Sequence, residues 1–471
     1  MSAKPSIATA VLLLTATAVH AATYQVGPTR PHTTLNALFA AVDLNGGDVV
    51  EVDGGVLYDA GTPGIIMPSA DGGSPGNPVV LRGISVGGAR PHLRGGVRVG
   101  STEANTIEFR LSNHVVFENF EVSGSGDTST GTFRCIYHHA HDIVIRGSVI
   151  RDCPRQGILG ADNDSGSLTV EYTEVRNAGS NGGNHAIYMA TDELTWPGAV
   201  FRLQHSWIHD SQFGAGEGGN LIKSRAERNE IYYNWLEDAY YHALELIGPD
   251  PSGGVPEDAA REDSDVVGNV IVHTADFGAV LRFGGDATGQ TFGRYRVVNN
   301  TIVRRNANND VPTIFRLFDG IDALDFHNNV IWREGGSSLT LVRAVEAEWA
   351  SGAARIQGSN NWIKTGFALN PAGTAITLTG TQTGALPGFT DLATLDLRPA
   401  PGSPLLNMGN AAPSAASGYQ ISAPLFPPTF HPPRQQLLAV GSAPARVPNG
   451  MIDIGAFEQV DSSQLFANGF E

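Results

Sequence analysis

Positive charge is scarce in this chain of 471 residues, which has 30 Lys and Arg against 47 Asp and Glu and a formal net charge of −17. Proteins that bind nucleic acid need a basic surface to displace the counterions of the phosphate backbone. The acidic balance therefore excludes a nucleic-acid-binding protein. Lysine is the rarest cation: the chain has Lys4, Lys223 and Lys364, and all its other cationic residues are arginines.

Long apolar runs are missing beyond the N-terminus. There, Lys4 is followed by AVLLLTATAV at 10–19 and by Val19-His20-Ala21. This pattern is typical of a secretory signal peptide and predicts cleavage after Ala21. No later stretch is long and apolar enough to span a bilayer. We therefore expect a secreted or periplasmic protein that has no membrane span and is a monomer.

Cysteine is almost absent, because Cys135 and Cys153 are the only two in the chain. Export from the cytoplasm permits a disulfide between them, and their separation of 18 residues suits two adjacent turns of a repeat. The other interpretation is two buried thiols. The sequence leaves both open.

What the chain does have is a short strand-like phrase that returns many times. Successive copies start 25 to 35 residues apart, and the clearest ones are FENFEV (117–122), IRGSVI (145–150), VEYTEV (170–175), LQHSWI (203–208), IYYNWL (231–236), VVGNVI (266–271), VVNNTI (297–302) and FHNNVI (326–331). A period of this size predicts a solenoid. Each unit alone cannot bury its apolar face, whereas stacked units share one continuous core.

The fourth position of the phrase becomes asparagine in the later copies. These residues are Asn234, Asn269, Asn300, Asn329 and, in a further copy, Asn361. An amide repeated at one position of stacked strands can hydrogen-bond to the next amide and form a ladder. The pattern predicts an all-β fold, a parallel β-helix, in which residues at matching positions of successive coils lie about 4.8 Å apart.

The segments on either side of the repeats have other patterns. TTLNALFAAVDL (33–44) has the apolar spacing of an amphipathic helix, which we expect to cap the open N-terminal end of the solenoid. We expect a last strand at 450–459, where the sequence is GMIDIGAFEQ. The predicted organisation is a signal peptide at 1–21, a capped β-helix at 22–398, a closing segment at 399–460 and a short tail at 461–471.

A second strand follows each phrase, and its central residue is flanked by apolar or small residues. Because side chains alternate between the two faces of a strand, these central residues should point outward together. We call them the ionisable column: Tyr188, Lys223, Glu245, Arg282 and Arg316. Three positions earlier, at the start of the strand, lie His185, Asn220 and His242, and Arg225 shares the outward face of the Lys223 strand.

This combination suits the cleavage of an acidic polysaccharide by β-elimination. The reaction needs a base, a cation that neutralises the uronate carboxylate, and a proton source for the leaving oxygen. Candidates for these three roles are, in order, Lys223 or Tyr188, Arg282 or Arg225, and His185 or His242. We expect Arg225, Glu245, Arg316 and Asn220 to contact the substrate. A polysaccharide lyase acting on a uronate-containing polymer is therefore the leading hypothesis.

The chain also resembles known proteins. GDVV (47–50), NPVVLRG (77–83), ARPHLRGG (89–96), DLRPAPGSPLLN (396–407) and DIGAFE (453–458), in this order, resemble secreted bacterial β-helix repeat proteins, which implies a right-handed parallel β-helix. The segment IKSRAERNEIYYN (222–234) partly resembles the Lys-Ser…Asn segment of the alginate lyase and chondroitinase B family. That resemblance implies that Lys223 is the base. One coil later, where the family's Arg is expected, the chain has Glu245.

Two alternatives remain. In a non-catalytic polysaccharide-binding or surface protein, the ionisable column would only hold the glycan. In a glycoside hydrolase, Asp210 and Asp238 would be the carboxylate pair, from a second column that also includes Asp152 and Asn177.

No cofactor is clearly indicated, although Ca²⁺ is a candidate. Asp210 and Asp238, the loop 161–167 and the acidic segment 256–265 all offer the oxygen ligands that Ca²⁺ prefers. Aspartates in exposed turns and solvated acidic loops explain the same residues without a ligand.

Overall fold

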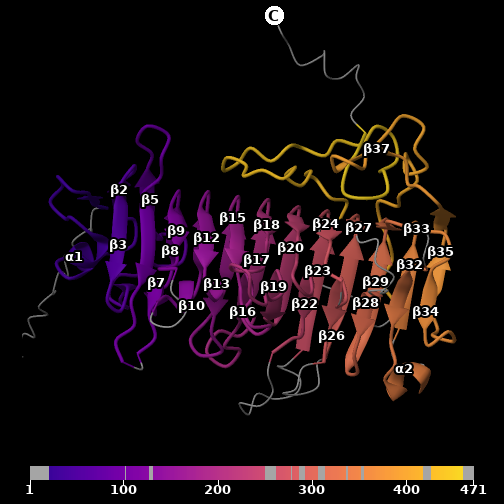
Figure 1. The fold of residues 1–471 in the computed structure, drawn as a ribbon, viewed down its shortest axis with the longest axis horizontal. Helices are drawn as coiled ribbons and strands as arrows, with labels where there is room; N and C mark the ends of the chain where they lie inside the picture. Colours follow the sequence, from indigo (N-terminus) through magenta and orange to yellow (C-terminus); the bar gives the residue numbers. More distant parts are fainter. Residues whose placement is uncertain are drawn as a thin grey trace, which may run out of the picture.

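The computed structural model describes residues 21–459 except 101, 127–130, 250–260, 277, 286–291, 306–312, 336–337, 352–354 and 417–425. The predicted signal peptide lies almost entirely outside the described residues. Within them, three long parallel sheets wind around one apolar core, and each coil passes through sheets A, B and C in turn (Figure 1). The predicted all-β parallel β-helix is therefore confirmed.

Sheet A carries the first part of the repeated phrase, whose last residues lie in sheet B. Its 13 described strands are, in spatial order, β1 (Thr23–Val26), β2 (Val49–Asp53), β5 (Val79–Ile84), β8 (Val115–Glu118), β11 (Ile143–Arg146), β14 (Leu168–Glu171), β17 (Val200–Gln204), β20 (Arg228–Tyr232), β23 (Arg261–Val267), β26 (Phe292–Val298), β29 (Ile321–His327), β32 (Arg355–Ser359) and β35 (Thr377–Thr379). The apolar residues of the phrase, such as Ile145 and Leu203, point into the core.

Sheet B follows sheet A after a tight turn. Its 12 described strands are β3 (Leu57–Gly61), β6 (His92–Gly96), β9 (Glu121–Ser123), β12 (Val149–Cys153), β15 (Glu174–Ala178), β18 (Trp207–His209), β21 (Trp235–Glu237), β24 (Val270–His273), β27 (Thr301–Arg304), β30 (Val330–Arg333), β33 (Trp362–Lys364) and β36 (Gln382–Gly384). The turn is tight because one residue per coil takes the left-handed conformation, for example Tyr233, Asn299 or Asn328.

Sheet C carries the ionisable column. Its 11 described strands are β4 (Ile65–Met67), β7 (Asn105–Arg110), β10 (Arg134–His139), β13 (Gln156–Gly160), β16 (Ile187–Ala190), β19 (Ile222–Arg225), β22 (Leu244–Leu246), β25 (Leu281–Phe283), β28 (Thr313–Leu317), β31 (Thr340–Arg343) and β34 (Ala368–Asn370). Loops of different lengths connect sheet C back to sheet A, and one of them contains the short helix α2 (Ala347–Ser351).

The predicted asparagine ladder is present at the turn between sheets A and B. The side-chain amide of Asn234 donates to Asn269 at 3.0 Å, Asn269 to Asn300 at 2.9 Å, and Asn300 to Asn329 at 3.0 Å. The ladder ends with a bond from Asn329 to Asn361 at 3.0 Å. Each amide oxygen also accepts the backbone N–H of the preceding rung. The ladder thus satisfies buried backbone groups as well as its own side chains.

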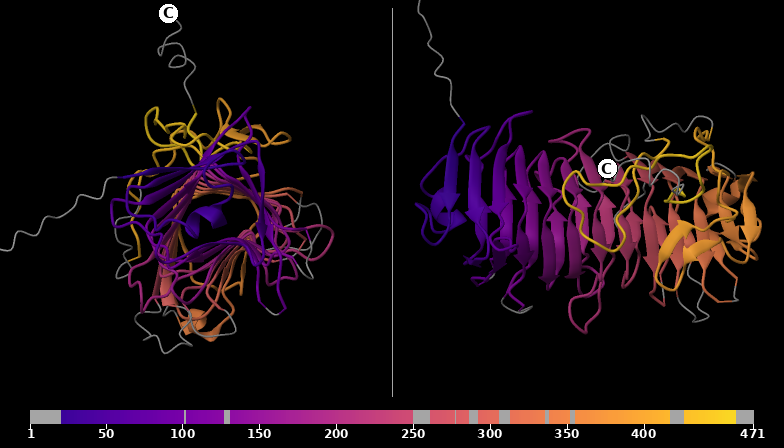
Figure 2. Two further views of the ribbon diagram at one scale, coloured as in Figure 1. Left: turned by 90° about the vertical axis from the view of Figure 1, so that its left-hand side faces the viewer. Right: turned by 90° about the horizontal axis from the view of Figure 1, so that it is seen from above.

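A helix lies near the N-terminal end of the solenoid but is shorter than expected. α1 spans Leu35–Phe39, with Thr34 as its N-cap, whereas the sequence pattern predicted a helix over 33–44. Leu35 and Leu38 are buried in the main core. Seen along the solenoid axis, α1 lies in the middle of the ring of coils (Figure 2). Its action as a cap remains a prediction. No helix in the described ranges is long and apolar enough to cross a membrane.

The two cysteines form a disulfide, which decides between the two interpretations of the sequence. Cys135 in β10 and Cys153 in β12 have a Cα–Cα distance of 5.8 Å, and both side chains are fully buried. The bond joins sheet C of one coil to sheet B of the next, because β11 lies between the two strands.

The C-terminal part of the chain folds back over sheet B (Figure 1). After the antiparallel pair β37 (Phe389–Asp391) and β38 (Asp396–Pro399), the described residues form few regular hydrogen bonds. The expectation of a strand at 450–459 is wrong, because these residues form no strand. Ile454 and Phe457 instead pack on the outward apolar face of sheet B, against side chains such as Trp235 and Val270. The segment therefore packs on this apolar face and does not pair with the edge of a strand.

The ladder predicts a large loss of stability when one rung is removed. We expect Asn300→Ala to lower the free energy of unfolding by about 3 kcal/mol, because buried groups on both neighbouring coils lose partners. The change is measured by urea denaturation followed by circular dichroism. Asn449→Ala is the matched control, since Asn449 is exposed. Equal free energies of unfolding for the two variants would contradict a stabilising role of the ladder.

The disulfide predicts a second stability change. Cys135→Ala with Cys153→Ala should lower the free energy of unfolding by about 3 kcal/mol, because the bond closes a loop that the unfolded chain would otherwise leave open. In the same denaturation experiment, reductant should lower the free energy of unfolding of the unchanged protein. It should leave that of the double variant unchanged. A reductant effect of the same size in the double variant would contradict this assignment.

Candidate functional site

The ionisable column is aligned by the pairing of sheet C. Tyr188 in β16 pairs with Lys223 in β19, Lys223 with Glu245 in β22, and Glu245 with Arg282 in β25. Arg282 pairs in turn with Arg316 in β28. The flanking residues, such as Ile222 and Leu244, are buried in the core. The parallel pairing therefore brings these five residues into one line on the outer face of the sheet.

Several predicted site residues are less exposed than their outward position suggested. Glu245 is 4% exposed, Arg225 5% and Arg316 8%, whereas Tyr188, Lys223 and Arg282 are half-buried. His185, Asn220 and His242, at the start of the same strands, are also buried. The expectation of a fully exposed column is wrong, because neighbouring charges and connecting loops cover its members.

Glu245 is the centre of a network of charges. Its Oε2 atom lies 3.8 Å from Lys223 Nζ and accepts a hydrogen bond of 2.5 Å from the side-chain amide of Asn220. Its Oε1 atom forms an ion pair with Arg282. The Glu245 carboxylate thus lies between two cations, one on each neighbouring coil. Lys223 is therefore better suited to supply positive charge than to accept a proton.

Glu346 and Phe318, which the sequence pattern did not predict, contact the arginines at the C-terminal end of the column. Arg316 forms an ion pair with Glu346, and one of its bonds to this carboxylate is 2.9 Å long. The guanidinium groups of Arg316 and Arg282 lie over the ring of Phe318, at 3.7 and 4.6 Å from its centroid. Phe318 and Glu346 lie in loops after β28 and β31, outside the repeating pattern, so no periodic signal identifies them.

The residues at the start of the strands form a hydrogen-bonded chain. The backbone N–H of Asn220 donates to His185 Nδ1 at 3.0 Å, and the backbone N–H of His242 donates to the Asn220 side-chain oxygen at 3.1 Å. Because His185 Nδ1 accepts a bond, the proton of the neutral ring lies on Nε2. Burial lowers the pKa of His242 to about 4, and the charges of Arg282 and Lys223 act in the same direction. His242 is therefore neutral at pH 7.

Tyr188 lies between the histidine chain and the cations. Its ring is 5.6 Å from the ring of His185, in an edge-to-face arrangement, and its centroid is 5.3 Å from Lys223 Nζ. Lys223 thus makes a cation–π contact with the Tyr188 ring. The arrangement thus supplies one group that can exchange a proton, one neutral imidazole and a fixed positive charge within two coils.

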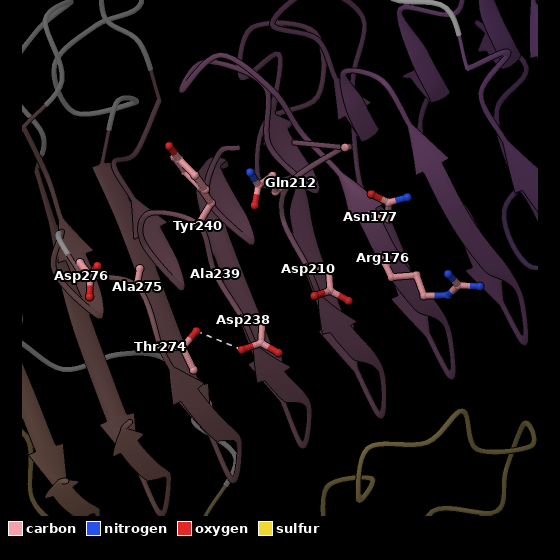
Figure 3. A pocket seen from close by; sticks show the side chains of 11 residues that line it. Arg176, Asn177, Asp210, Gln212, Asp238, Ala239, Tyr240, Thr274, Ala275 and Asp276 are labelled. Atoms are coloured by element: carbon pink, nitrogen blue, oxygen red, sulfur yellow. Dashed lines mark hydrogen bonds between the residues drawn. The ribbon is translucent and has the colours of Figure 1, made fainter. Parts of the chain in front are cut away.

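The second column forms a pocket at the turn between sheets B and C (Figure 3). The pocket has a volume of about 700 Å³, and its lining includes Asp210, Asp238 and Tyr240. Asp210 and Asp238 lie on successive coils, both in the left-handed conformation. Thr274 donates a hydrogen bond of 3.0 Å to Asp238.

The electrostatics of the pocket do not favour a hydrolase acid at Asp210. His209 Nδ1 lies 2.7 Å from the Asp210 carboxylate, and this hydrogen bond lowers the pKa of Asp210. The general acid of a glycoside hydrolase needs a raised pKa. As to Ca²⁺, the described part of the chain contains no group of three or more His, Cys, Asp or Glu side chains arranged to hold a metal ion. Residues 256–260 of the acidic segment lie outside the described residues.

Comparisons with known proteins found similar solved structures but no related sequence. No family model matches the chain, and no curated protein is similar to it in sequence. Among solved structures, pectate lyase Pel9A is similar, with 12% identity and a TM-score of 0.41 over 93% of this chain and 96% of that one. An alginate lyase from Paenibacillus sp. str. FPU-7 has 15% identity and a TM-score of 0.36, over 77% of this chain and 99% of that one.

The similar structures also include an adhesin. The Streptococcus pneumoniae surface protein PfbA is 9% identical, with a TM-score of 0.35 over 72% of this chain and 89% of that one. At such low identity, function has to be argued from the residues of this chain.

The charge network predicts that Glu245 stabilises the fold. We expect Glu245→Gln to lower the free energy of unfolding by about 3 kcal/mol, because Lys223 and Arg282 lose the carboxylate between them. Urea denaturation at pH 7 measures the change. Asp59→Asn is the matched control: its ion pair with Arg94 is exposed and should contribute less than about 1 kcal/mol. A loss at Glu245 no larger than at Asp59 would contradict the network.

Proposed function

We propose that this protein is a carbohydrate-active enzyme that cleaves a uronate-containing polysaccharide by β-elimination on the outer face of sheet C. The observation that carries the proposal is the line of Tyr188, Lys223, Glu245 and Arg282 on four successive coils. It combines a proton-exchanging group with fixed cations, and an acidic sugar chain needs both.

In the proposed reaction, Tyr188 removes the proton next to the uronate carboxylate. Tyr188 suits this role better than Lys223, because Lys223 is engaged with Glu245 as a cation. Removal of the proton forms a carbon–carbon double bond as the bond to the glycosidic oxygen breaks. Tyr188 must first give its own phenol proton to solvent, and it is a phenol again once it has taken the substrate proton. Lys223 Nζ lies 5.3 Å from the centroid of its ring, on the side where the substrate carboxylate would bind.

The remaining roles fall to neighbouring side chains. Lys223 and Arg282 neutralise the substrate carboxylate, whose charge increases in the transition state. His185 donates a hydrogen bond from Nε2–H to the leaving oxygen, since the bond to Nδ1 holds the ring in place, and the leaving oxygen takes its proton from solvent water. Arg225, Arg316, Asn220 and His242 position these groups and the sugar chain.

The proposed location is outside the cytoplasm. A disulfide persists only where the surroundings are oxidising, and the bond between Cys135 and Cys153 fits such a compartment. Extracellular or periplasmic polysaccharide is then the available substrate.

A second candidate function is non-catalytic binding of the same polymer. The observation in its favour is that the cations of the column are already paired with Glu245 and Glu346. Such a pre-formed network can hold an acidic glycan without any proton transfer.

The first test is the ultraviolet absorbance of the mature protein mixed with polygalacturonate, alginate and other uronate polymers. β-Elimination creates an unsaturated uronate that absorbs, whereas hydrolysis and binding do not. We expect an increase, and we expect Tyr188→Phe to lower kcat by at least about 100-fold, the usual contribution of a general base. Tyr24→Phe, in the first strand of sheet A, is the matched control and should be fully active.

The outcomes separate the hypotheses. Loss of activity in Lys223→Arg, with full activity in Tyr188→Phe, would transfer the role of base to Lys223. Sugar release without absorbance, abolished by Asp210→Asn or Asp238→Asn, would favour the hydrolase. No reaction with any polymer, combined with binding that is lost in Lys223→Ala, would favour the binding protein.

A further inference from the structure

The pocket at the turn between sheets B and C has no role in the proposed reaction. Its volume of about 700 Å³ is in the range of cavities that hold small ligands, which is about 300 to 1,000 Å³. Its lining comes from successive coils, as Figure 3 shows, and the loop between β18 and β19 adds Gln212 and Gly214. We call this cavity the turn pocket.

The turn pocket contains two carboxylates that the protein holds in place. One oxygen of Asp238 accepts a hydrogen bond of 3.0 Å from the Thr274 hydroxyl. One oxygen of Asp210 lies 2.7 Å from His209 Nδ1, and this bond lowers the pKa of Asp210. Among the described residues, the second oxygen of each carboxylate has no hydrogen-bond partner. Each aspartate therefore offers one oriented acceptor to a ligand.

Hydrogen-bond donors line the same cavity. The Arg176 Nε atom lies 2.9 Å from the Glu174 carboxylate, and the guanidinium has further N–H groups beyond this ion pair. Gln212 has a side-chain amide, which offers both a donor and an acceptor. A hydroxyl group both donates and accepts hydrogen bonds. A ligand with many hydroxyl groups can therefore bond to the carboxylates and to these donors at once.

Part of the lining of the turn pocket is apolar. Ala239, Tyr240 and Ala275 contribute to it, and the Tyr240 side chain is partly exposed. A sugar ring has hydroxyl groups around its edge and C–H groups on its faces, and such faces pack against aromatic and aliphatic side chains. The combination of polar and apolar lining therefore fits a saccharide better than an inorganic ion.

The charges of the turn pocket select against an acidic sugar. Asp210, Asp238 and Asp276 line it, whereas its cation, Arg176, is already paired with Glu174. These aspartates repel a ligand carboxylate. They do not form a metal site either: within the described residues, no group of three or more His, Cys, Asp or Glu side chains could hold a metal ion. An uncharged saccharide is therefore the ligand class that fits the lining.

A second cavity of about 360 Å³ adjoins the turn pocket, because Asp238 and Thr274 line both. The C-terminal segment forms part of this second cavity through Leu395 and Gln435. The Gln435 side-chain amide is held there by a hydrogen bond of 2.7 Å, which it donates to Glu237. The space for a ligand therefore continues along the solenoid beyond the turn pocket.

We propose that the turn pocket binds a neutral, hydroxyl-rich saccharide, and that longer chains extend into the adjoining cavity. This inference does not rest on the proposed function, since it uses no residue of the ionisable column and assigns a different class of sugar. A protein with both sites binds neutral sugars at the turn between sheets B and C and acidic sugars on the outer face of sheet C.

The test measures the binding of neutral tetrasaccharides to the full mature protein carrying Tyr188→Phe. Cellotetraose, mannotetraose and β-1,4-galactotetraose are titrated calorimetrically at pH 7, with tetragalacturonate as the charged ligand of equal length. We expect at least one neutral tetrasaccharide to bind, and its disaccharide to bind more weakly. Asp238→Asn should weaken this binding about tenfold and Gln212→Ala about threefold, because hydrogen bonds to charged groups contribute more than neutral ones.

Asp142→Asn is the matched control. Asp142 is also an exposed aspartate in the left-handed conformation, but it lies just before β11, outside the turn pocket. This variant should bind the neutral tetrasaccharide like the parent, and thermal unfolding verifies that every variant is folded. Tetragalacturonate should bind equally well to the parent and to Gln212→Ala.

Three results would overturn the inference: no binding of any neutral tetrasaccharide, equal binding by folded Asp238→Asn, Gln212→Ala and Asp142→Asn, or weaker tetragalacturonate binding by Gln212→Ala. The last result would assign the turn pocket to an acidic sugar. The proposed function fails by a different measurement. Neutral tetrasaccharide binding that depends on Asp238 and Gln212, without an absorbance increase on any uronate polymer, would support this inference and contradict the proposed β-elimination.

Discussion

The structure depends on the requirement that polar groups at a buried corner find partners on the next coil. At the turn between sheets A and B, each asparagine of the ladder bonds to the side chain and the backbone of its neighbour. A shift of one coil by a single residue would leave these groups without partners inside the core, at a cost of several kcal/mol. The corner therefore fixes the register of the coils from Asn234 to Asn361, and Ser206 extends the same kind of bond to the coil before them. The rows of side chains on sheet C are a consequence of this register.

That constraint explains why the line of functional residues was predictable. A repeat of known phase determines which residue of each coil points outward, and Tyr188, Lys223, Glu245 and Arg282 follow from it directly. Their burial did not follow, because the partners come from outside the repeat. Glu346 and Phe318 lie in connecting loops, whose sequences carry no periodic signal.

The ends of the molecule were harder to predict than its middle. The helix pattern at 33–44 extended past the residues that form α1, since an amphipathic spacing does not determine where hydrogen bonding stops. At 450–459, alternating apolar residues suggested a strand, but this segment meets the apolar face of sheet B instead of a strand edge. There Asn328 supplies a carbonyl to Gly455, and Asn299 donates to Asp453. Such contacts between residues far apart in sequence have no local signature.

The docking of the C-terminal segment has a consequence for how the chain is made. Trp235, Val270 and Trp332 belong to coils that are synthesised well before Ile454 and Phe457, the residues that cover the same apolar cluster. During synthesis, the coils can stack in order while this stripe of sheet B still faces water. A chain released before residue 454 would expose the stripe permanently and present it to other chains. Docking of the C-terminal segment is therefore the step that removes this apolar stripe from water.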